Sequence, residues 1–272
     1  MVCVLMAHAP AQADDSVPAR WRAQFAKRAG CFVVHEIGSG QTWRSDARAC
    51  ARRRSPFSTF KIPHSLIGLD PGVLAGPEAM IPWDRARHPA EDWWPATWQE
   101  PHTLRSALAS SVVPYYRALA GRIGAKAMKR YLRGFDYGNQ AMGPQLDDFW
   151  LAGSLAISAD EQVAFLTRLQ QRRLPVAERT ADIVQDILEL ERTPGYVLRG
   201  KTGLGPIGRR RYLGWLVGLV ESCGKVYAYA LWIEGKTMAD TSVERFPMTR
   251  AMLSDLGALP ADASACAADP AP

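Results

Sequence analysis

The chain has 272 residues, of which 47% are hydrophobic and 22% are charged, so its size and composition are those of a globular protein with one large domain or two closely packed ones. Its formal net charge is +6, but arginines cluster only at 52–54 and 209–211, and the second cluster has no assignable role. No nucleic-acid-binding motif accompanies them, so we expect a solvated basic face and no nucleic-acid partner.

The first 13 residues resemble an export signal that lacks its usual start. Residues 2–7 are apolar, Ala11-Gln12-Ala13 has the small-x-small form of a cleavage site, and two aspartates follow. A positively charged beginning is missing, so either the start codon is misassigned or the N-terminus is irregular; we favour a truncated signal peptide. No later apolar run approaches the roughly 20 residues that span a bilayer. We therefore expect a soluble periplasmic protein that has no membrane span and begins near residue 14.

A short amphipathic helix over residues 17–29 and a β-hairpin are expected next. The hairpin strands cover residues 31–37 and 41–44, and they meet at a Gly-Ser-Gly turn.

The positions of the cysteines are consistent with the predicted export. Cys31 and Cys50 lie at the two open ends of the hairpin, where they can come close enough for a disulfide. Closing a loop of that size is worth about 3 kcal/mol in the chain-entropy model. Two reduced, buried thiols are the alternative. Cys223 and Cys266 show no evident reason to pair.

The middle of the chain is expected to be mainly helical, from residue 59 to about 190. The helical pattern is clearest at 159–171, where Ser158 can cap the helix, and at 176–190. Strands are then expected at 196–202, 212–220 and 226–233, followed by a final helix at 243–256. A tight Cys223-Gly224 turn joins the last two strands.

This order of elements predicts an α+β fold. Sequential hairpins make the sheet antiparallel, and the helical middle must form a layer of its own. We expect one domain with two subdomains and a tail. The sheet subdomain would consist of residues 14–57 and 195–260, and the helical subdomain of residues 58–194. Residues 261–272 would form a disordered tail. The cleft between the subdomains is the expected place for a ligand site.

Three short motifs carry the chemistry. Ser58-Thr59-Phe60-Lys61 places a serine one helical turn before a lysine, so both side chains reach the same point. A serine hydroxyl is a weak nucleophile until an adjacent base removes its proton. Ser111-Val112-Val113 and Lys201-Thr202-Gly203 follow in the order found in serine enzymes that acylate on β-lactams. The conjunction indicates the function, because a serine that caps a helix would explain Ser58 alone.

With these motifs, the chain resembles the class D β-lactamases from about residue 31 to 257. Tyr137-Gly138-Asn139 and Phe149-Trp150-Leu151 match triplets of that class, and Arg245 matches its carboxylate-binding arginine. The sequence differs at Arg117, where the family usually has Gln. The resemblance implies a serine β-lactamase/penicillin-binding transpeptidase-like fold, with an antiparallel sheet flanked by helices and a mainly helical subdomain.

The resemblance also implies catalytic roles. Ser58 would attack the β-lactam carbonyl, and Lys61 would be the base as an N-carboxylated lysine. Only a neutral amine adds CO₂, and burial among apolar groups favours the neutral form. The matching pocket positions are Phe60, Val113, Trp150 and Leu151. The indole N–H of Trp150 would hold the carbamate. The alternatives are a surface lysine and a merely packed tryptophan.

The remaining motif residues would bind the substrate. Ser111 would relay a proton to the leaving nitrogen. Lys201 and Thr202 would offer charge and a hydroxyl beside Gly203, whose missing side chain lets the ligand approach the strand. The resemblance implies that the oxyanion hole consists of the backbone N–H groups of Ser58 and Leu204. Arg245 would hold the drug's carboxylate, and its alternative is an exposed helix arginine. Tyr137-Gly138-Asn139 is expected to be mainly structural.

We therefore expect a β-lactamase that hydrolyses penicillin-type drugs and needs no cofactor beyond CO₂. Five histidines without paired spacing argue against a metal site. A membrane-tethered penicillin sensor and a slow transpeptidase or carboxypeptidase are the alternatives. The sequence does not show whether carbapenems or oxyimino-cephalosporins are substrates. It does not show the oligomeric state either.

Overall fold

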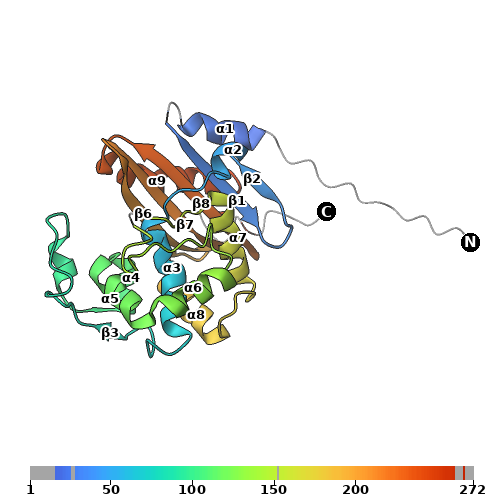
Figure 1. Ribbon diagram of the computed structural model, residues 1–272. Coiled ribbons are helices and arrows are strands. Elements are labelled where there is room, and N and C mark those ends of the chain that lie inside the picture. The colour runs from blue at the N-terminus through green and yellow to red at the C-terminus, as the bar shows by residue number, and fades with distance from the viewer. Residues whose placement is uncertain (1–15, 26–27, 152, 261–265, 267–272) are drawn as a thin grey trace, which may run out of the picture.

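A six-stranded antiparallel sheet lies at the centre of the computed structural model, which describes residues 16–25, 28–151, 153–260 and 266 (Figure 1). The strand order is β2-β1-β8-β7-β6-β5. The strands are β1 (Gly30–Glu36), β2 (Thr42–Arg44), β5 (Glu189–Arg192), β6 (Tyr196–Gly208), β7 (Arg211–Ser222) and β8 (Lys225–Gly235). The early hairpin joins the late strands where β1 pairs with β8. The predicted fold class is confirmed.

Helices cover both faces of the sheet. Helices α1 (Ser16–Phe25) and α9 (Met238–Ser254) pack on one face, where Trp21, Phe32 and Met252 are buried together. Helix α7 (Ala159–Gln170) packs on the opposite face against β1 and β8. The sheet layer thus includes a helix from the middle of the chain.

The helical layer is built around α3 (Lys61–Leu69), which follows the 3₁₀ turn η1 (Phe57–Phe60). Every residue of α3 is buried, as expected for a helix that is enclosed on all sides. The elements around it are α4 (Leu104–Ala109), α5 (Val113–Ile123), α6 (Ala125–Gly134) and α8 (Glu178–Ile187). The shorter elements are α2 (Ala47–Cys50), η2 (Ala96–Gln99), β3 (Met80–Ile81) and β4 (His102–Thr103).

Several predicted elements are present with different ends. Helix α7 begins after Ser158, which forms a reciprocal capping box with Glu161, as expected. The helix predicted at 176–190 ends at Ile187, because Leu190 belongs to the edge strand β5. Helix α9 begins five residues earlier than predicted, since Thr237 caps it. The strands β6 and β7 continue beyond the predicted ends because they pair with each other as far as residues 208 and 211.

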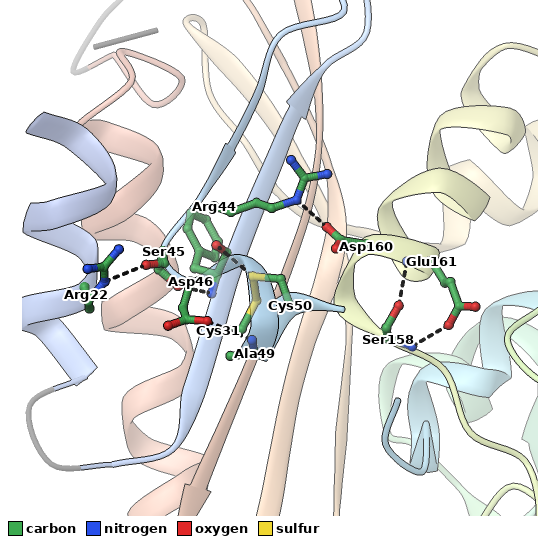
Figure 2. Close-up of a disulfide and its surroundings, with 11 residues drawn as sticks. Arg22, Cys31, Arg44, Ser45, Asp46, Ala49, Cys50, Ser158, Asp160 and Glu161 are labelled. Atoms are coloured by element: carbon green, nitrogen blue, oxygen red, sulfur yellow. Dashed lines mark hydrogen bonds and ion pairs between the residues drawn. A yellow bond between two sulfur atoms is a disulfide. The ribbon is translucent and has the colours of Figure 1, made fainter. Parts of the chain in front are cut away.

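The disulfide between Cys31 and Cys50 is confirmed, although Cys50 lies on α2 and not on the hairpin strand. Figure 2 shows it beside the Asp46 side chain, which caps α2 by accepting from Ala49 N. Cys223 and Cys266 were expected to stay unpaired, and this prediction is wrong because they form a disulfide with each other. These residues are 43 positions apart, so no local pattern could link them. The predicted signal segment lies outside the described residues.

Within the described ranges, no helix is both long and apolar enough to cross a membrane.

Candidate active site

Ser58 lies in η1, a turn that is pressed against strand β6. Glycines on the strand permit this approach. A Cβ on Gly203 would lie 2.7 Å from the carbonyl oxygen of Pro56, and one on Gly205 would overlap the ring of Phe57. The η1 turn therefore fills the space beside Gly203. We had expected this space to be open to a ligand. Phe57 has a positive φ of 48°, which costs a non-glycine residue free energy and often marks a functional site.

Lys61 begins α3, and its amine reaches back to the serine. Nζ lies 2.7 Å from Ser58 Oγ, and the lysine is fully buried. Desolvation lowers the pKa of Lys61 well below its ordinary value, and the positive charges of Lys201 and Arg117 lower it further. This shift favours the neutral amine, the form whose lone pair can accept the serine proton. A surface lysine is excluded.

An aromatic chamber surrounds the Lys61 amine. Its Nζ lies 5.3 Å from the centre of the Tyr116 ring, and the rings of Phe60 and Trp150 are stacked at 5.7 Å. Trp150 is fully buried, and its indole N–H has no acceptor in the described part of the chain. Buried donors normally have a partner. A CO₂-derived carbamate on Lys61 would supply acceptor oxygens, so the chamber fits this group.

The Tyr137-Gly138-Asn139 triplet holds the segment that carries Trp150. The Asn139 side chain donates to the carbonyl of Ser154 at 2.7 Å and accepts from Ala156 N at 2.9 Å. Gly138 has a φ of 56°, and a Cβ there would overlap the Ala156 carbonyl. These are contacts of the kind expected for a triplet with a structural role.

Ser111 and Lys201 meet across the cleft between the two layers. Lys201 Nζ donates to Ser111 Oγ at 3.1 Å and lies 3.3 Å from Thr202 Oγ1. Ser111 also has a positive φ, 58°. Burial, followed by the charge of Arg245, lowers the pKa of Lys201 to about 7. At neutral pH this lysine can therefore both give and take a proton.

Arg245 is buried, with 8% of its surface exposed, so the exposed helix arginine is the wrong alternative. Its Nη1 donates to the carbonyl of Gly203 at 2.8 Å and reaches that of Trp215 at 3.4 Å. Burial lowers its pKa to about 10. The arginine thus holds the motif strand in place from α9. Only the part of the guanidinium other than Nη1 remains to bind a ligand.

A cavity of about 250 Å³ brings these groups together. It is lined by Ser58, Trp93, Pro95, Trp98, Ser111, Val113, Leu151, Thr202, Leu204, Met238 and Arg245. A second cavity, of about 580 Å³, shares Trp93, Leu151, Leu204 and Met238 with the first and is lined mainly by apolar side chains. Phe60, Trp150 and Lys201 are buried and do not line the first cavity. No group of three or more metal-binding side chains occurs among the residues that the structure describes.

Arg117 on α5 links the two loops that wall this cleft. Its Nη1 lies 2.6 Å from a carboxylate oxygen of Glu91, in the loop that carries Trp93. Its Nη2 lies 3.3 Å from a carboxylate oxygen of Asp148, two residues before Trp150. The sequence pattern gave no reason to expect this connection.

Comparisons with known proteins identify the family. The penicillin-binding protein transpeptidase domain matches residues 18–254. β-Lactamase OXA-48 of Klebsiella pneumoniae is 36% identical over 213 residues, which are 78% of either chain. β-Lactamase OXA-10 of Pseudomonas aeruginosa is 35% identical over 77% of this chain and 79% of that one. The crystal structure of the class D β-lactamase YbXI from Nostoc covers 89% of this chain and 99% of its own, with 35% identity and a TM-score of 0.82.

The chain belongs to the class D β-lactamases.

The structure of this class D β-lactamase places one more residue beside the site. The sequence motifs do not mark this residue. His64 lies on α3 three residues after Lys61, is fully buried, and contacts the ring of Trp150. The spacing puts it on the same helix face as the lysine. That spacing was the available signal, but a buried helix histidine is usually just part of the core.

Arg245→Ala is expected to weaken both folding and substrate binding in this β-lactamase. The change removes a buried guanidinium that donates to the carbonyl of Gly203 and reaches that of Trp215, and a hydrogen bond from a charged group typically contributes about 1.5–3 kcal/mol to the free energy of unfolding. Loss of the expected charge-assisted bond to a substrate carboxylate should also raise KM for penicillins by about tenfold or more. Urea unfolding and steady-state kinetics measure the two effects. Arg250→Ala, five residues later on α9 in an exposed ion pair, is the control and should change neither much.

An Arg245→Ala variant with unchanged unfolding and unchanged KM would refute both roles.

Proposed function

We propose that the protein is a serine β-lactamase that hydrolyses penicillin-type antibiotics through an acyl-enzyme on Ser58. The observation that carries this proposal is the 2.7 Å contact between Ser58 Oγ and the amine of the fully buried Lys61. Activation of a serine requires a base at this distance in a form that can take a proton. The relatives that are named β-lactamases support the same reaction.

For acylation, we propose that the Ser58 proton passes to the base at Lys61 as Oγ attacks the β-lactam carbonyl carbon. The backbone N–H groups of Ser58 and Leu204 would stabilise the oxyanion, and a donor of this kind is typically worth about 3 kcal/mol. When the ring C–N bond breaks, Ser111 would give its proton to the leaving nitrogen and be reprotonated by Lys201. The 3.1 Å contact between them and the lowered pKa of Lys201 support this relay.

We also propose that Lys61 works as a carbamate. Such a group supplies an anionic general base for acylation and for activating the hydrolytic water. The residues that would hold it are Trp150, through its unpartnered indole N–H, and the apolar walls Phe60, Val113 and Leu151. These walls keep water from the amine and so favour the neutral form to which CO₂ adds.

The substrate would bind along the motif strand. Thr202 and the free part of the Arg245 guanidinium line the cleft and would bind the β-lactam carboxylate. The adjoining cavity between Trp93 and Met238 would receive an apolar acyl side chain. We further propose that the protein is exported to the periplasm, since its two disulfides require an oxidising compartment.

A slow transpeptidase or a penicillin sensor would also acylate, so turnover decides between them. Purified protein is expected to hydrolyse nitrocefin for many cycles per active site, as followed by its colour change. A single stoichiometric burst without further hydrolysis would contradict the hydrolase and favour an acylating protein that stays blocked.

A further inference from the structure

The chamber around the Lys61 amine contains a second unpartnered polar group, the imidazole of His64. The side chain is fully buried, and neither Nδ1 nor Nε2 has a hydrogen-bond partner within the described ranges. Its ring lies 5.4 Å from Phe60, 5.2 Å from Tyr116 and 5.1 Å from Trp150, measured between centroids. Among these rings, that of Tyr116 lies 5.3 Å from the Lys61 Nζ.

The position of His64 on α3 directs it towards the lysine. It follows Lys61 by three residues, and helical side chains tilt towards the N-terminus, so the imidazole lies over the turn in which Lys61 sits. The Tyr116 ring contacts both groups, since it lies 5.3 Å from the Lys61 Nζ and 5.2 Å from the imidazole. The imidazole is therefore a wall of the same chamber.

None of the three rings packed against His64 forms a hydrogen bond with it. The Phe60 ring has no acceptor, and the indole of Trp150 is a donor only. The hydroxyl of Tyr116 is paired with Ser65 at 2.9 Å, as the donor since Ser65 Oγ gives its own proton to the Lys61 carbonyl, and it makes no hydrogen bond to the imidazole. The chamber thus holds two buried ring groups with N–H bonds to donate, and neither forms a hydrogen bond with any residue that the structure describes. Buried polar groups in native proteins normally have partners, so the chamber is built for a group with at least two acceptor atoms.

The imidazole is also kept uncharged. Burial, and then the positive charge of Lys61, lower the pKa of His64 to about 3. A neutral ring carries an N–H on one nitrogen at any working pH and can donate it. The ring thus contributes a donor without bringing a second buried charge into the chamber.

We propose that His64 is a positioning residue for the Lys61 carbamate, donating from one ring nitrogen to one carboxylate oxygen while Trp150 donates to the other. This inference rests on the proposed carbamate and names a second residue that holds it. Two donors on different elements, α3 and the segment after Asn139, fix the plane of the group. A base held in one plane faces Ser58 and the hydrolytic water in a constant orientation.

Two substitutions separate this role from simple packing. His64→Phe keeps a ring against Trp150 and Tyr116 but removes both nitrogens. His64→Gln loses the ring but keeps an N–H donor of similar reach. Each purified variant is titrated with ¹³C-bicarbonate, and the carbamate ¹³C NMR signal gives the apparent dissociation constant for CO₂. This readout does not depend on turnover.

His64→Phe is expected to weaken CO₂ binding by about tenfold or more, because a hydrogen bond to a charged group typically contributes that much. His64→Gln should stay within about threefold of the wild type. Tyr131→Phe is the control, since it removes a tyrosine hydroxyl outside the chamber, one that donates to Asp70 at 2.6 Å, and it should bind CO₂ as the wild type does. Normal binding by His64→Phe, or equal weakening in both His64 variants, would overturn the proposal.

A measurement on the unaltered protein guards against variants that fail to fold. With ¹⁵N-labelled histidine, the ring nitrogen signals of His64 should shift when bicarbonate is added and follow the growth of the carbamate signal. A carbamate signal without any His64 shift would overturn the role of His64 alone. No carbamate signal in the wild type would overturn the proposed base as well.

Discussion

Ser58→Ala is expected to abolish covalent acylation by penicillins and leave the fold intact. In serine hydrolases that depend on one nucleophile, its removal costs about 10⁶ in kcat. The fold should survive because the turn is held by other groups: Thr59 Oγ1 donates to the Pro56 carbonyl at 2.8 Å and accepts from Gln162 at 2.8 Å. Ser58 Oγ contributes only its contact with Lys61 to this local network.

Intact mass after incubation with a penicillin measures acylation directly. The wild type should gain the mass of the drug, and Ser58→Ala should gain nothing. Thr59→Val is the matched control. It should lower the melting temperature, because it breaks the bonds that hold η1, and still leave a nucleophile that acylates. An adduct on Ser58→Ala, or one mapped to a peptide without Ser58, would disprove the assignment.

Trp150→Phe is expected to slow deacylation by about 10²–10⁴, the usual cost of losing a general base. The change keeps a six-membered ring beside Phe60 and Phe149, and it removes the five-membered part of the indole with the N–H that has no partner among the described residues. Deacylation should suffer more than acylation, because a water must be activated after the acyl group blocks Ser58. Acyl-enzyme should therefore accumulate in the variant, visible by mass spectrometry during turnover.

The pH dependence follows from the direction of the Lys61 shift. Burial lowers its pKa, so the amine stays neutral to lower pH than an ordinary lysine. As pH falls through that lowered pKa, the amine is protonated and any carbamate is lost, so activity should fall on the acid side. Added bicarbonate should restore a decarboxylated wild-type sample and restore Trp150→Phe poorly.

Trp21→Phe is the control for this series, since it removes an indole N–H that donates to Asp255 at 3.0 Å on the far face of the sheet. It should leave the bicarbonate response unchanged. Full activity of the wild type with no ¹³C carbamate signal would show that Lys61 acts as a plain amine.

Local patterns predicted the parts of the fold that local chemistry determines. Ser158 and Glu161 form a capping box that any helix start of this kind would form, and α7 begins where expected. The Cys223-Gly224 turn was also predictable, because both residues adopt positive φ in a two-residue hairpin connection. Leu190 was assigned to a helix by its apolar spacing, but pairing with β6 places its segment at the sheet edge.

The motif residues of the site were predictable, and their energetic surroundings were not. The contact between Ser111 and Lys201 joins residues 90 positions apart, and only the motif order pointed to it. The burial of Arg245 depends on how α9 lies across β6 and β7, which no spacing encodes. His64 reads in the sequence as one more buried helix position. Its unpartnered nitrogens become visible only when the rings of other elements are in place.

The ion pairs of Arg117 connect the position of the Trp93 loop with the environment of Lys61. One guanidinium pairs with Glu91 on the Trp93 loop and with Asp148 beside Trp150, and its charge also lowers the pKa of Lys61. A substrate large enough to push the Trp93 loop outward must strain the same side chain that steadies the surroundings of the proposed base. We therefore expect a change that displaces the Trp93 loop to alter the electrostatic environment of Lys61 as well, because both depend on the Arg117 side chain.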